Sequence, residues 1–202
     1  MMQILRRFRS NNSSPVIVVS GLPRSGTSLM MQMLVSGGLT PITDQQRPPD
    51  INNPKGYYEF ERVKALEHGD TAWLADAPGK VVKVVSALLK YLPADYHYRI
   101  IFMQREIDEI LRSQQAMLNQ LEKPTQGFED PEALRWQYEK HLHTVQAWLE
   151  DQRHLQTLFV PHRGLIQNPQ YHAQAINTFI DGRLDSAAMC AVVDPQLYRQ
   201  RQ

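Results

Sequence analysis

The chain has 202 residues, of which 42% are hydrophobic and 21% are charged, and its 22 Lys and Arg against 21 Asp and Glu give a formal net charge of +1. This composition predicts one ordinary folded domain and argues against global disorder, a general nucleic-acid coat protein and a polybasic membrane binder. The single cysteine, Cys190, excludes an internal disulfide and a cysteine-based zinc site, and it fits a reducing, cytoplasmic setting.

The N-terminal segment differs from the rest of the chain. It carries Arg6, Arg7 and Arg9 and then a polar run, without the apolar segment of a signal peptide. We expect residues 1–14 to form a flexible arm and residues 15–202 to form the domain. No apolar stretch approaches the roughly 20 residues that a membrane-spanning helix needs. No membrane span is therefore expected.

Short β-branched runs alternate with segments of helical apolar spacing. The runs predict strands over residues 15–20, 81–85, 98–104 and 157–160, and the spacing predicts helices over residues 27–35, 106–120, 130–152 and 168–181. This alternation predicts a single three-layer α/β/α domain with a mostly parallel sheet of four or five strands, like that of the P-loop NTPases. The proline-rich segment over residues 40–56 is expected to be a functional or mobile loop.

The most informative segment follows the first predicted strand. Gly21 and Gly26 are five positions apart and precede Thr27 and Ser28, which is the P-loop frame GxxxxGK[ST] with threonine in place of lysine. Glycines let a backbone wrap around an oxyanion, and the amides and dipole of the next helix favour negative charge. The loop lacks the P-loop lysine, and the third predicted strand is followed by Arg105 rather than by an acidic residue that could bind a metal ion. Both features favour binding of a nucleotide-like anion without a metal over metal-assisted ATP chemistry. A tight turn without a ligand is the alternative.

At these residues the sequence resembles the sulfotransferase family. Arg24-Ser25-Gly26-Thr27-Ser28 matches the family loop [K/R]-S-G-T-[T/S], which binds the 5′-phosphosulfate of 3′-phosphoadenosine 5′-phosphosulfate (PAPS). Arg105 at a strand end and Ser113 eight positions later match the family pair that binds the 3′-phosphate. Residues 53–59, 83–89 and 193–199 resemble a bacterial branch, so that the likeness runs from about residue 15 to 199.

The resemblance implies an enzyme that moves a sulfonate from PAPS to a hydroxyl or amine of a small-molecule, glycan or lipid acceptor by metal-independent in-line transfer. Arg24 is assigned to the leaving phosphate, and Ser25, Gly26, Thr27 and Ser28 to the 5′-phosphate. From the residues alone, Arg105 is also consistent with a surface ion pair, with Glu106 or Asp108, and Ser113 with an ordinary solvated helix serine.

The catalytic assignments also depend on the resemblance. Lys83 matches a strand lysine of the family and is expected to stabilise the moving sulfonate, unless its amine reaches solvent from the strand end. Val85 stands at the position of the family's catalytic histidine. We therefore expect a carboxylate base, as in glycan and tyrosine sulfotransferases, with Glu59 the first choice and Asp44 the second. A helix-terminal glutamate is the alternative role for Glu59.

Two further departures concern the nucleotide. Leu29 replaces the tryptophan that stacks on adenine in animal members, and Pro161-His162-Arg163-Gly164 replaces a Tyr-Glu-Asp-like turn. Two other functions stay open at this point. They are a P-loop small-molecule kinase or NTPase and a non-catalytic nucleotide-binding protein.

Overall fold

The computed structural model describes residues 14–44, 56–120 and 130–194. The expected arm, apart from Ser14, and residues 45–55 of the proline-rich loop lie outside these ranges. The α-helices and strands follow one another as β1 (Val16–Gly21), α1 (Thr27–Ser36), β2 (Val81–Lys83), β3 (Tyr98–Gln104), α2 (Ile107–Gln120), α3 (Pro131–Glu150), β4 (Leu155–Pro161), α4 (His162–Gln167), α5 (Pro169–Phe179) and α6 (Ser186–Ala191). Three 3₁₀ helices lie between α1 and β3 in the sequence: η1 (Glu61–His68), η2 (Ala72–Asp76) and η3 (Ser86–Tyr91).

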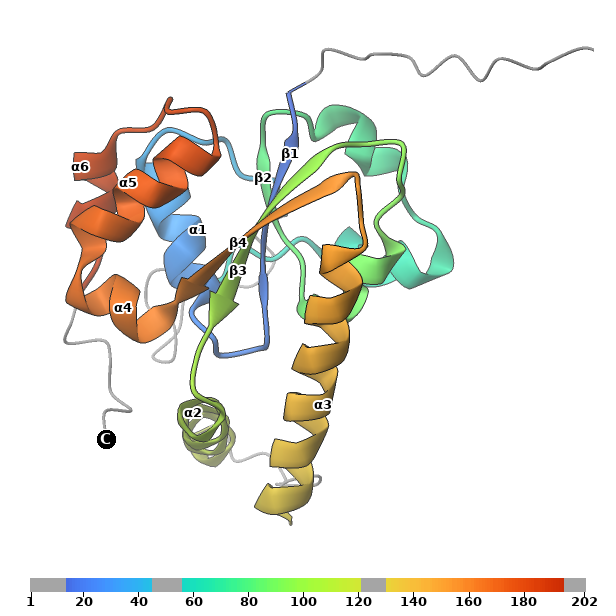
Figure 1. The fold of residues 1–202 in the computed structure, drawn as a ribbon, viewed down its shortest axis with the longest axis vertical. Coiled ribbons are helices and arrows are strands. Elements are labelled where there is room, and N and C mark those ends of the chain that lie inside the picture. The colour runs from blue at the N-terminus through green and yellow to red at the C-terminus, as the bar shows by residue number, and fades with distance from the viewer. Residues whose placement is uncertain (1–13, 45–55, 121–129, 195–202) are drawn as a thin grey trace, which may run out of the picture.

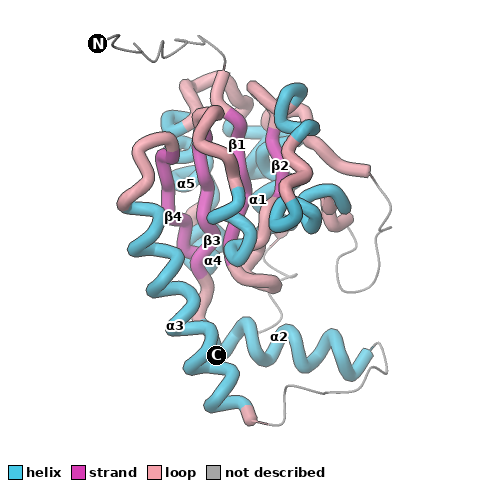
Figure 2. Tube along the Cα trace, turned by 90° about the vertical axis from the view of Figure 1, so that its right-hand side faces the viewer, coloured by secondary structure: helices cyan, strands magenta, loops and turns pink. Residues whose placement is uncertain are grey.

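The four strands form one parallel sheet in the order β2-β1-β3-β4. This confirms the predicted α/β class and the parallel sheet of four strands. Because the strands are parallel, their carboxyl ends meet at one edge of the sheet, where ligands bind in open α/β folds. Figure 1 shows β3 and β4 ending beside the start of α2 and α4, and Figure 2 shows the four strands edge to edge.

Alternating side chains of β1 build two separate cores. Val16 and Val18 pack on one face of the sheet with residues of the 3₁₀ helices and α3. Ile17 and Val19 pack on the other face with residues of α1, α4, α5 and α6. Figure 1 shows these two helical groups on opposite sides of the sheet. The expected three-layer arrangement and the expected burial of this strand on both faces are therefore confirmed.

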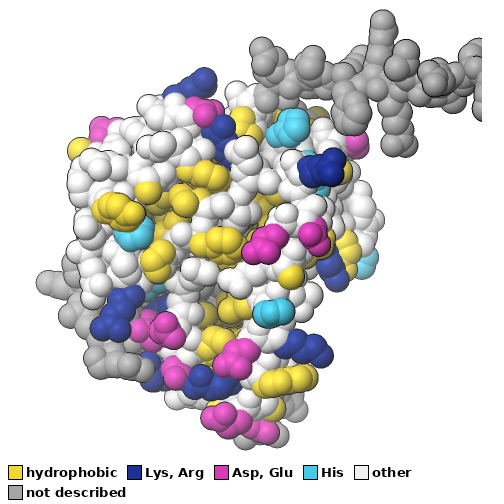
Figure 3. All heavy atoms as spheres, in the orientation of Figure 1, with side chains coloured by type: hydrophobic (Ala, Val, Ile, Leu, Met, Phe, Trp, Pro, Cys, Tyr) yellow, Lys and Arg dark blue, Asp and Glu magenta, His cyan; other side chains and the backbone are white. Residues whose placement is uncertain are grey.

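Helices α2 and α3 extend beyond the carboxyl edge of the sheet. The start of α3 follows the sequence prediction, because Asp130 Oδ1 accepts hydrogen bonds from the amides of Glu132 and Ala133 and Pro131 is the first helical residue. The two helices are joined by a 2.9 Å hydrogen bond from Gln114 Nε2 to the hydroxyl of Tyr138. Figure 2 shows both helices projecting past the sheet, and Figure 3 shows acidic and basic side chains crowded at that end of the molecule.

The largest differences from the predicted elements lie at the strand ends and in short helices. β2 ends at Lys83, two residues earlier than expected, because the chain turns there into η3. β4 is longer than expected, since it begins at Leu155 and ends at Pro161. The six-residue helices α4 and α6 were not expected. A helix this short contains fewer than two turns, so its apolar residues show no repeat.

Candidate active site

The loop between β1 and α1 has the backbone of an anion cradle. Gly26 caps α1 with a left-handed φ of 102°, and no side chain caps the helix. The first amides of α1 have no partner within the helix, as at every helix N-terminus. The amide of Ser25 is used within the loop, because it donates to the carbonyl of Leu22 at 3.1 Å. Thr27 and Ser28 lie half-buried in the first turn of α1.

Both glycines of the frame are required by their surroundings. A Cβ on Gly21, where φ is 145°, would lie 2.7 Å from the carbonyl oxygen of Met103 on the neighbouring strand. A Cβ on Gly26 would overlap the ring of His162 at the end of β4. The spacing of the two glycines thus reflects close packing of the loop against the ends of β3 and β4.

Ser25 places a buried hydroxyl in the loop. The residue is 1% exposed, and its Oγ has no hydrogen-bond partner among the described residues. A buried hydroxyl without a partner is energetically costly, so such a group usually indicates a ligand, an ion or water. The residues present therefore fit an oxyanion held in this loop.

Arg24 and Ser113 meet although they are far apart in the sequence. Arg24 Nε donates to Ser113 Oγ at 3.0 Å. Ser113 lies on α2 and is 7% exposed, so it is not the solvated serine that its place in the sequence also allowed. Arg24 itself adopts a positive φ of 70°, which is uncommon for a residue with a Cβ.

Arg105 also contacts the loop. Its Nη1 donates to the carbonyl of Arg24 at 2.9 Å, and its Nε donates to Glu109 Oε2 at 2.9 Å. The side chains of Arg105 and Glu109 are 9% and 3% exposed. The ion pair considered in the sequence, with Glu106 or Asp108, is therefore made with Glu109 and is buried. Asp108 pairs with Arg135 of α3 instead.

Lys83 and Glu59 lie together beyond the end of β2. Lys83 Nζ is 3.7 Å from Glu59 Oε1, and it donates a hydrogen bond to the carbonyl of Tyr57. The Lys83 side chain is only 10% exposed, so the amine does not reach freely into solvent. The structure thus brings the two residues together, with Lys83 opposite Val19 of β1.

Asp44, the second candidate base, has a local structural contact. Its Oδ2 accepts a 2.6 Å hydrogen bond from the amide of Glu61, the first residue of η1. Its own amide donates to the carbonyl of Glu59 at 3.3 Å. Asp44 therefore helps to hold the segment that carries Glu59.

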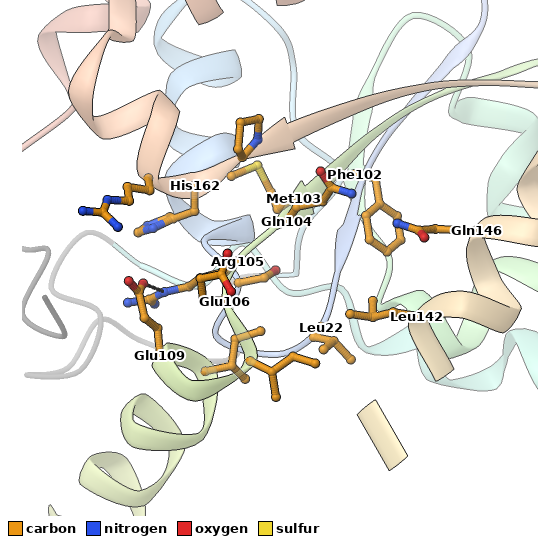
Figure 4. Close-up of a pocket in the computed structure, with 15 residues that line it drawn as sticks. Leu22, Phe102, Met103, Gln104, Arg105, Glu106, Glu109, Leu142, Gln146 and His162 are labelled. Carbon is orange, nitrogen blue, oxygen red and sulfur yellow. Dashed lines mark hydrogen bonds and ion pairs between the residues drawn. The ribbon is translucent and has the colours of Figure 1, made fainter. Parts of the chain in front are cut away.

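A cavity of about 410 Å³ opens at the carboxyl ends of β1, β3 and β4. Figure 4 shows Leu22, Phe102 and Leu142 on one side of it and His162, Arg105 and Glu109 on the other. The full lining is Leu22, Ser25, Phe102, Met103, Gln104, Arg105, Glu106, Ile107, Glu109, Ile110, Leu142, Gln146, Pro161, His162 and Arg163. The cavity therefore joins the loop to an apolar wall and to a charged pair.

His162 is a site residue that the sequence noted only as a departure from a family turn. It is 7% exposed and packs against Gly26. Burial and, to a smaller extent, the charge of Arg105 lower the pKa of His162 to about 4, against an opposing effect of Glu109. The imidazole is therefore neutral at ordinary pH. Because its neighbours Gly26, Arg105 and Glu109 lie before α1, after β3 and on α2, no local pattern in the sequence could have placed it here.

A second histidine, His141 of α3, contacts the segment that follows β2. Its Nε2 makes a 2.8 Å hydrogen bond with Oγ of Ser86, the first residue of η3. Burial lowers the pKa of His141, and nearby Lys90 lowers it further. The contact joins α3 to the segment that follows Lys83.

Among the residues that the structure describes, no helix is long and apolar enough to cross a membrane. Within the same ranges, no three His, Cys, Asp or Glu side chains are grouped so that they could hold a metal ion.

The sequence matches the sulfotransferase domain family over residues 14–196. The chain belongs to this family. The family consists of enzymes that use PAPS, and the resemblance seen in the loop motif is thereby confirmed. A comparison with curated proteins found no match.

Two solved sulfotransferase domains share the fold. The domain from the curacin biosynthetic pathway is 15% identical, with a TM-score of 0.53 over 90% of this chain and 78% of that one. The domain from the Synechococcus PCC 7002 olefin synthase is also 15% identical, with a TM-score of 0.51 over 93% of this chain and 87% of that one. At this identity the likeness shows the fold alone.

Proposed function

We propose that this sulfotransferase domain moves a sulfonate from PAPS to a hydroxyl or amine of a small-molecule, glycan or lipid acceptor without a metal ion. The observation that carries the proposal is the convergence of Arg24, Ser113 and Arg105 on one P-loop-like turn that lacks a lysine. Arg24 belongs to the loop itself, Ser113 of α2 contacts its side chain, and Arg105, which follows β3, contacts its carbonyl. A loop built only to turn the chain would need none of these contacts.

The loop is assigned to the 5′-phosphosulfate. Ser25 contributes its buried hydroxyl rather than its amide, since the amide already bonds to Leu22. Gly26, Thr27 and Ser28 contribute the helix N-terminus, whose dipole favours negative charge. Arg24 contacts the leaving phosphate with a guanidinium that stays charged at all working pH values.

Ser113 and Arg105 are assigned to the 3′-phosphate. Ser113 and Arg105 offer this anion a hydroxyl and a guanidinium, and the 3.0 Å bond from Arg24 to Ser113 joins this pair to the arginine assigned to the leaving phosphate. The nucleoside is placed in the adjoining cavity, because Ser25 and Arg105 both line it. The cavity wall of Leu22, Phe102 and Leu142 offers apolar surface to the adenine ring. This surface would take the place of the stacking tryptophan, which is Leu29 in this chain.

The acceptor is placed on the other side of the loop. β1 lies between β2 and β3 in the sheet, so Lys83 and Arg105 are separated by the strand that carries the loop. Lys83 is positioned to stabilise negative charge on the moving group, and Glu59 to accept the proton of the acceptor. A base of this kind contributes about 10²- to 10⁴-fold to the rate.

The proposed transfer accounts for every bond and proton without a metal ion. The acceptor oxygen or nitrogen forms a bond to sulfur, the sulfur–oxygen bond to the phosphate breaks, and Glu59 takes the proton. Catalysis of this kind depends on positioning and on charges fixed before the reaction. Fixed donors and cations suffice because a sulfonate carries less charge than a terminal phosphate.

The test is a transfer assay with labelled PAPS and a panel of sugars, lipids, phenols and amines. We expect at least one acceptor to be labelled in the presence of a chelator, and the activity to be lost in Arg24→Ala and Glu59→Gln. Firm binding of the cofactor product without labelling of any acceptor would reject the catalytic proposal and favour a non-catalytic nucleotide-binding protein.

A further inference from the structure

The peptide group between Arg24 and Ser25 is held at both ends. Its carbonyl accepts a 2.9 Å hydrogen bond from Arg105 Nη1, and its amide donates to the carbonyl of Leu22 at 3.1 Å. The preceding residue, Arg24, has a φ of 70°, a region that residues with a Cβ rarely adopt. Such a conformation persists only where the surrounding contacts hold it.

Glu109 contacts this carbonyl indirectly, through Arg105. Arg105 Nε donates to Glu109 Oε2 at 2.9 Å, and both side chains are buried. A guanidinium is planar, so a bond at Nε fixes the direction of its other donors. Figure 4 shows Arg105 and Glu109 side by side at the cavity, joined by a dashed line. The contacts thus run from Glu109 through Arg105 to the backbone of Arg24.

We propose that Glu109 is a positioning residue, which orients Arg105 so that its guanidinium fixes the Arg24 carbonyl and keeps the loop in its binding conformation. The role of the loop in binding the nucleotide rests on the proposed function, whereas the effect of Glu109 on the loop does not. An arginine has five N–H donors, so one side chain can hold this carbonyl and still contact an anion.

The alternative role for Glu109 is to compete with the 3′-phosphate for Arg105. A carboxylate that merely occupied Arg105 until the 3′-phosphate displaced it would weaken nucleotide binding. Glu109→Gln would then tighten the binding of ligands that carry a 3′-phosphate. If Glu109 instead organises the loop, the same substitution weakens every ligand of the loop. The two roles therefore predict effects of opposite sign.

The first measurement needs no ligand. Hydrogen–deuterium exchange is followed in residues 22–28 of the ligand-free protein and of Glu109→Gln. The control is Asp108→Asn, which removes the neighbouring carboxylate on α2 and its ion pair with Arg135. We expect exchange in the loop to become about tenfold or more faster in Glu109→Gln and to stay unchanged in Asp108→Asn. Unchanged exchange in Glu109→Gln would overturn the proposal.

The second measurement is calorimetry with 5′-AMP and with 3′,5′-ADP, which differ only in the 3′-phosphate. Residues that orient the ligands of a metal ion contribute about 10- to 100-fold, and by analogy we expect Glu109→Gln to weaken both ligands by a similar factor in this range. Tighter binding of 3′,5′-ADP would show a competitor and overturn the proposal. If the unchanged protein bound neither ligand, the proposed function would fail, while the exchange measurement would still decide the role of Glu109.

A second variant covers the case in which Glu109→Gln does not fold. Arg105→Lys keeps a positive charge beside the buried carboxylate but cannot contact Glu109 and the Arg24 carbonyl through one planar group. We expect faster loop exchange in this variant as well. A folded Arg105→Lys protein with the exchange of the unchanged protein would overturn the proposal.

Discussion

Arg24 Nε and Ser113 Oγ are 3.0 Å apart, although 89 positions separate the two residues in the chain. The contact joins the loop after β1 to the second turn of α2. It therefore places the two halves of the proposed nucleotide site, the cradle and the 3′-phosphate pair, within one short distance.

Ser113→Ala tests whether this contact serves the nucleotide. A hydrogen bond to a charged group contributes about 1.5–3 kcal/mol, so we expect 3′,5′-ADP to bind about tenfold or more weakly to the variant. Calorimetry at one pH and salt concentration measures the change. The control is Gln115→Ala on the same helix, where the side chain bonds to Asn119 near the surface. Equal affinities of Ser113→Ala and the unchanged protein would remove Ser113 from the site.

Gly26→Ala tests the close packing of the loop against His162. The matched control is Gly38→Ala, because Gly38 also has a positive φ, 113°, but a Cβ there would meet nothing within 4 Å. We expect Gly38→Ala to lower the free energy of unfolding by about 1–3 kcal/mol through backbone strain alone. Gly26→Ala should cost about 1–3 kcal/mol more through the clash.

Urea unfolding measures both free energies. The added change His162→Ala should recover part of the loss in Gly26→Ala, and it should recover nothing in Gly38→Ala. The same cost for both single glycine variants would contradict the packing that the structure shows.

Glu59→Gln tests the proposed base. We expect the rate of transfer to fall about 10²- to 10⁴-fold, with binding of 3′,5′-ADP unchanged, because the proton acceptor acts on the acceptor and not on the nucleotide. Steady-state kinetics and calorimetry separate the two effects. The control is Glu61→Gln, an exposed carboxylate two residues later that pairs with Lys64. Full activity of Glu59→Gln together with loss of activity in His141→Gln would move the base to His141.

The pH dependence of stability tests the burial of His162. The unfolded state binds a proton on this residue below about pH 6.5, whereas the folded state binds it only below about pH 4. The free energy of unfolding should therefore fall as the pH decreases from 6.5 to 4, by a contribution on the order of 3 kcal/mol. His162→Gln removes this contribution, so its stability curve should be flatter in that window. His143→Gln, at an exposed position on α3, is the control. Parallel curves for all three proteins would show that His162 is not buried as a neutral ring.

Much of the fold could be predicted because the strong signals are local. The apolar run that became β1 and the alternation of strands with helices led to the parallel sheet. The end of β2 could not be predicted, since Val84 and Val85 continue the β-branched run while the chain already turns toward η3. Propensity does not show where a partner strand stops pairing, and β2 pairs with β1 over only three residues.

Part of the candidate site also has a signal in the sequence. The glycine frame and the spacing of Arg105 and Ser113 are visible in the sequence, and the structure brings these residues together. Glu109 had a usable signal, because it stands four positions after Arg105, and opposite charges at this spacing often pair at a helix start. His162 had none, since its contact with Gly26 joins elements that are distant in the chain. Tertiary packing, rather than local pattern, decides such positions.

The central claim is that the loop binds a bisphosphorylated adenosine through Arg24 without a metal. Calorimetry with 3′,5′-ADP in the presence of a chelator, and with ATP and magnesium, tests it most directly, with Arg24→Ala measured alongside. The account predicts that 3′,5′-ADP binds more tightly than ATP–magnesium and that this binding is lost in Arg24→Ala. Preferred binding of ATP–magnesium, or unchanged affinity for 3′,5′-ADP in Arg24→Ala, would contradict it.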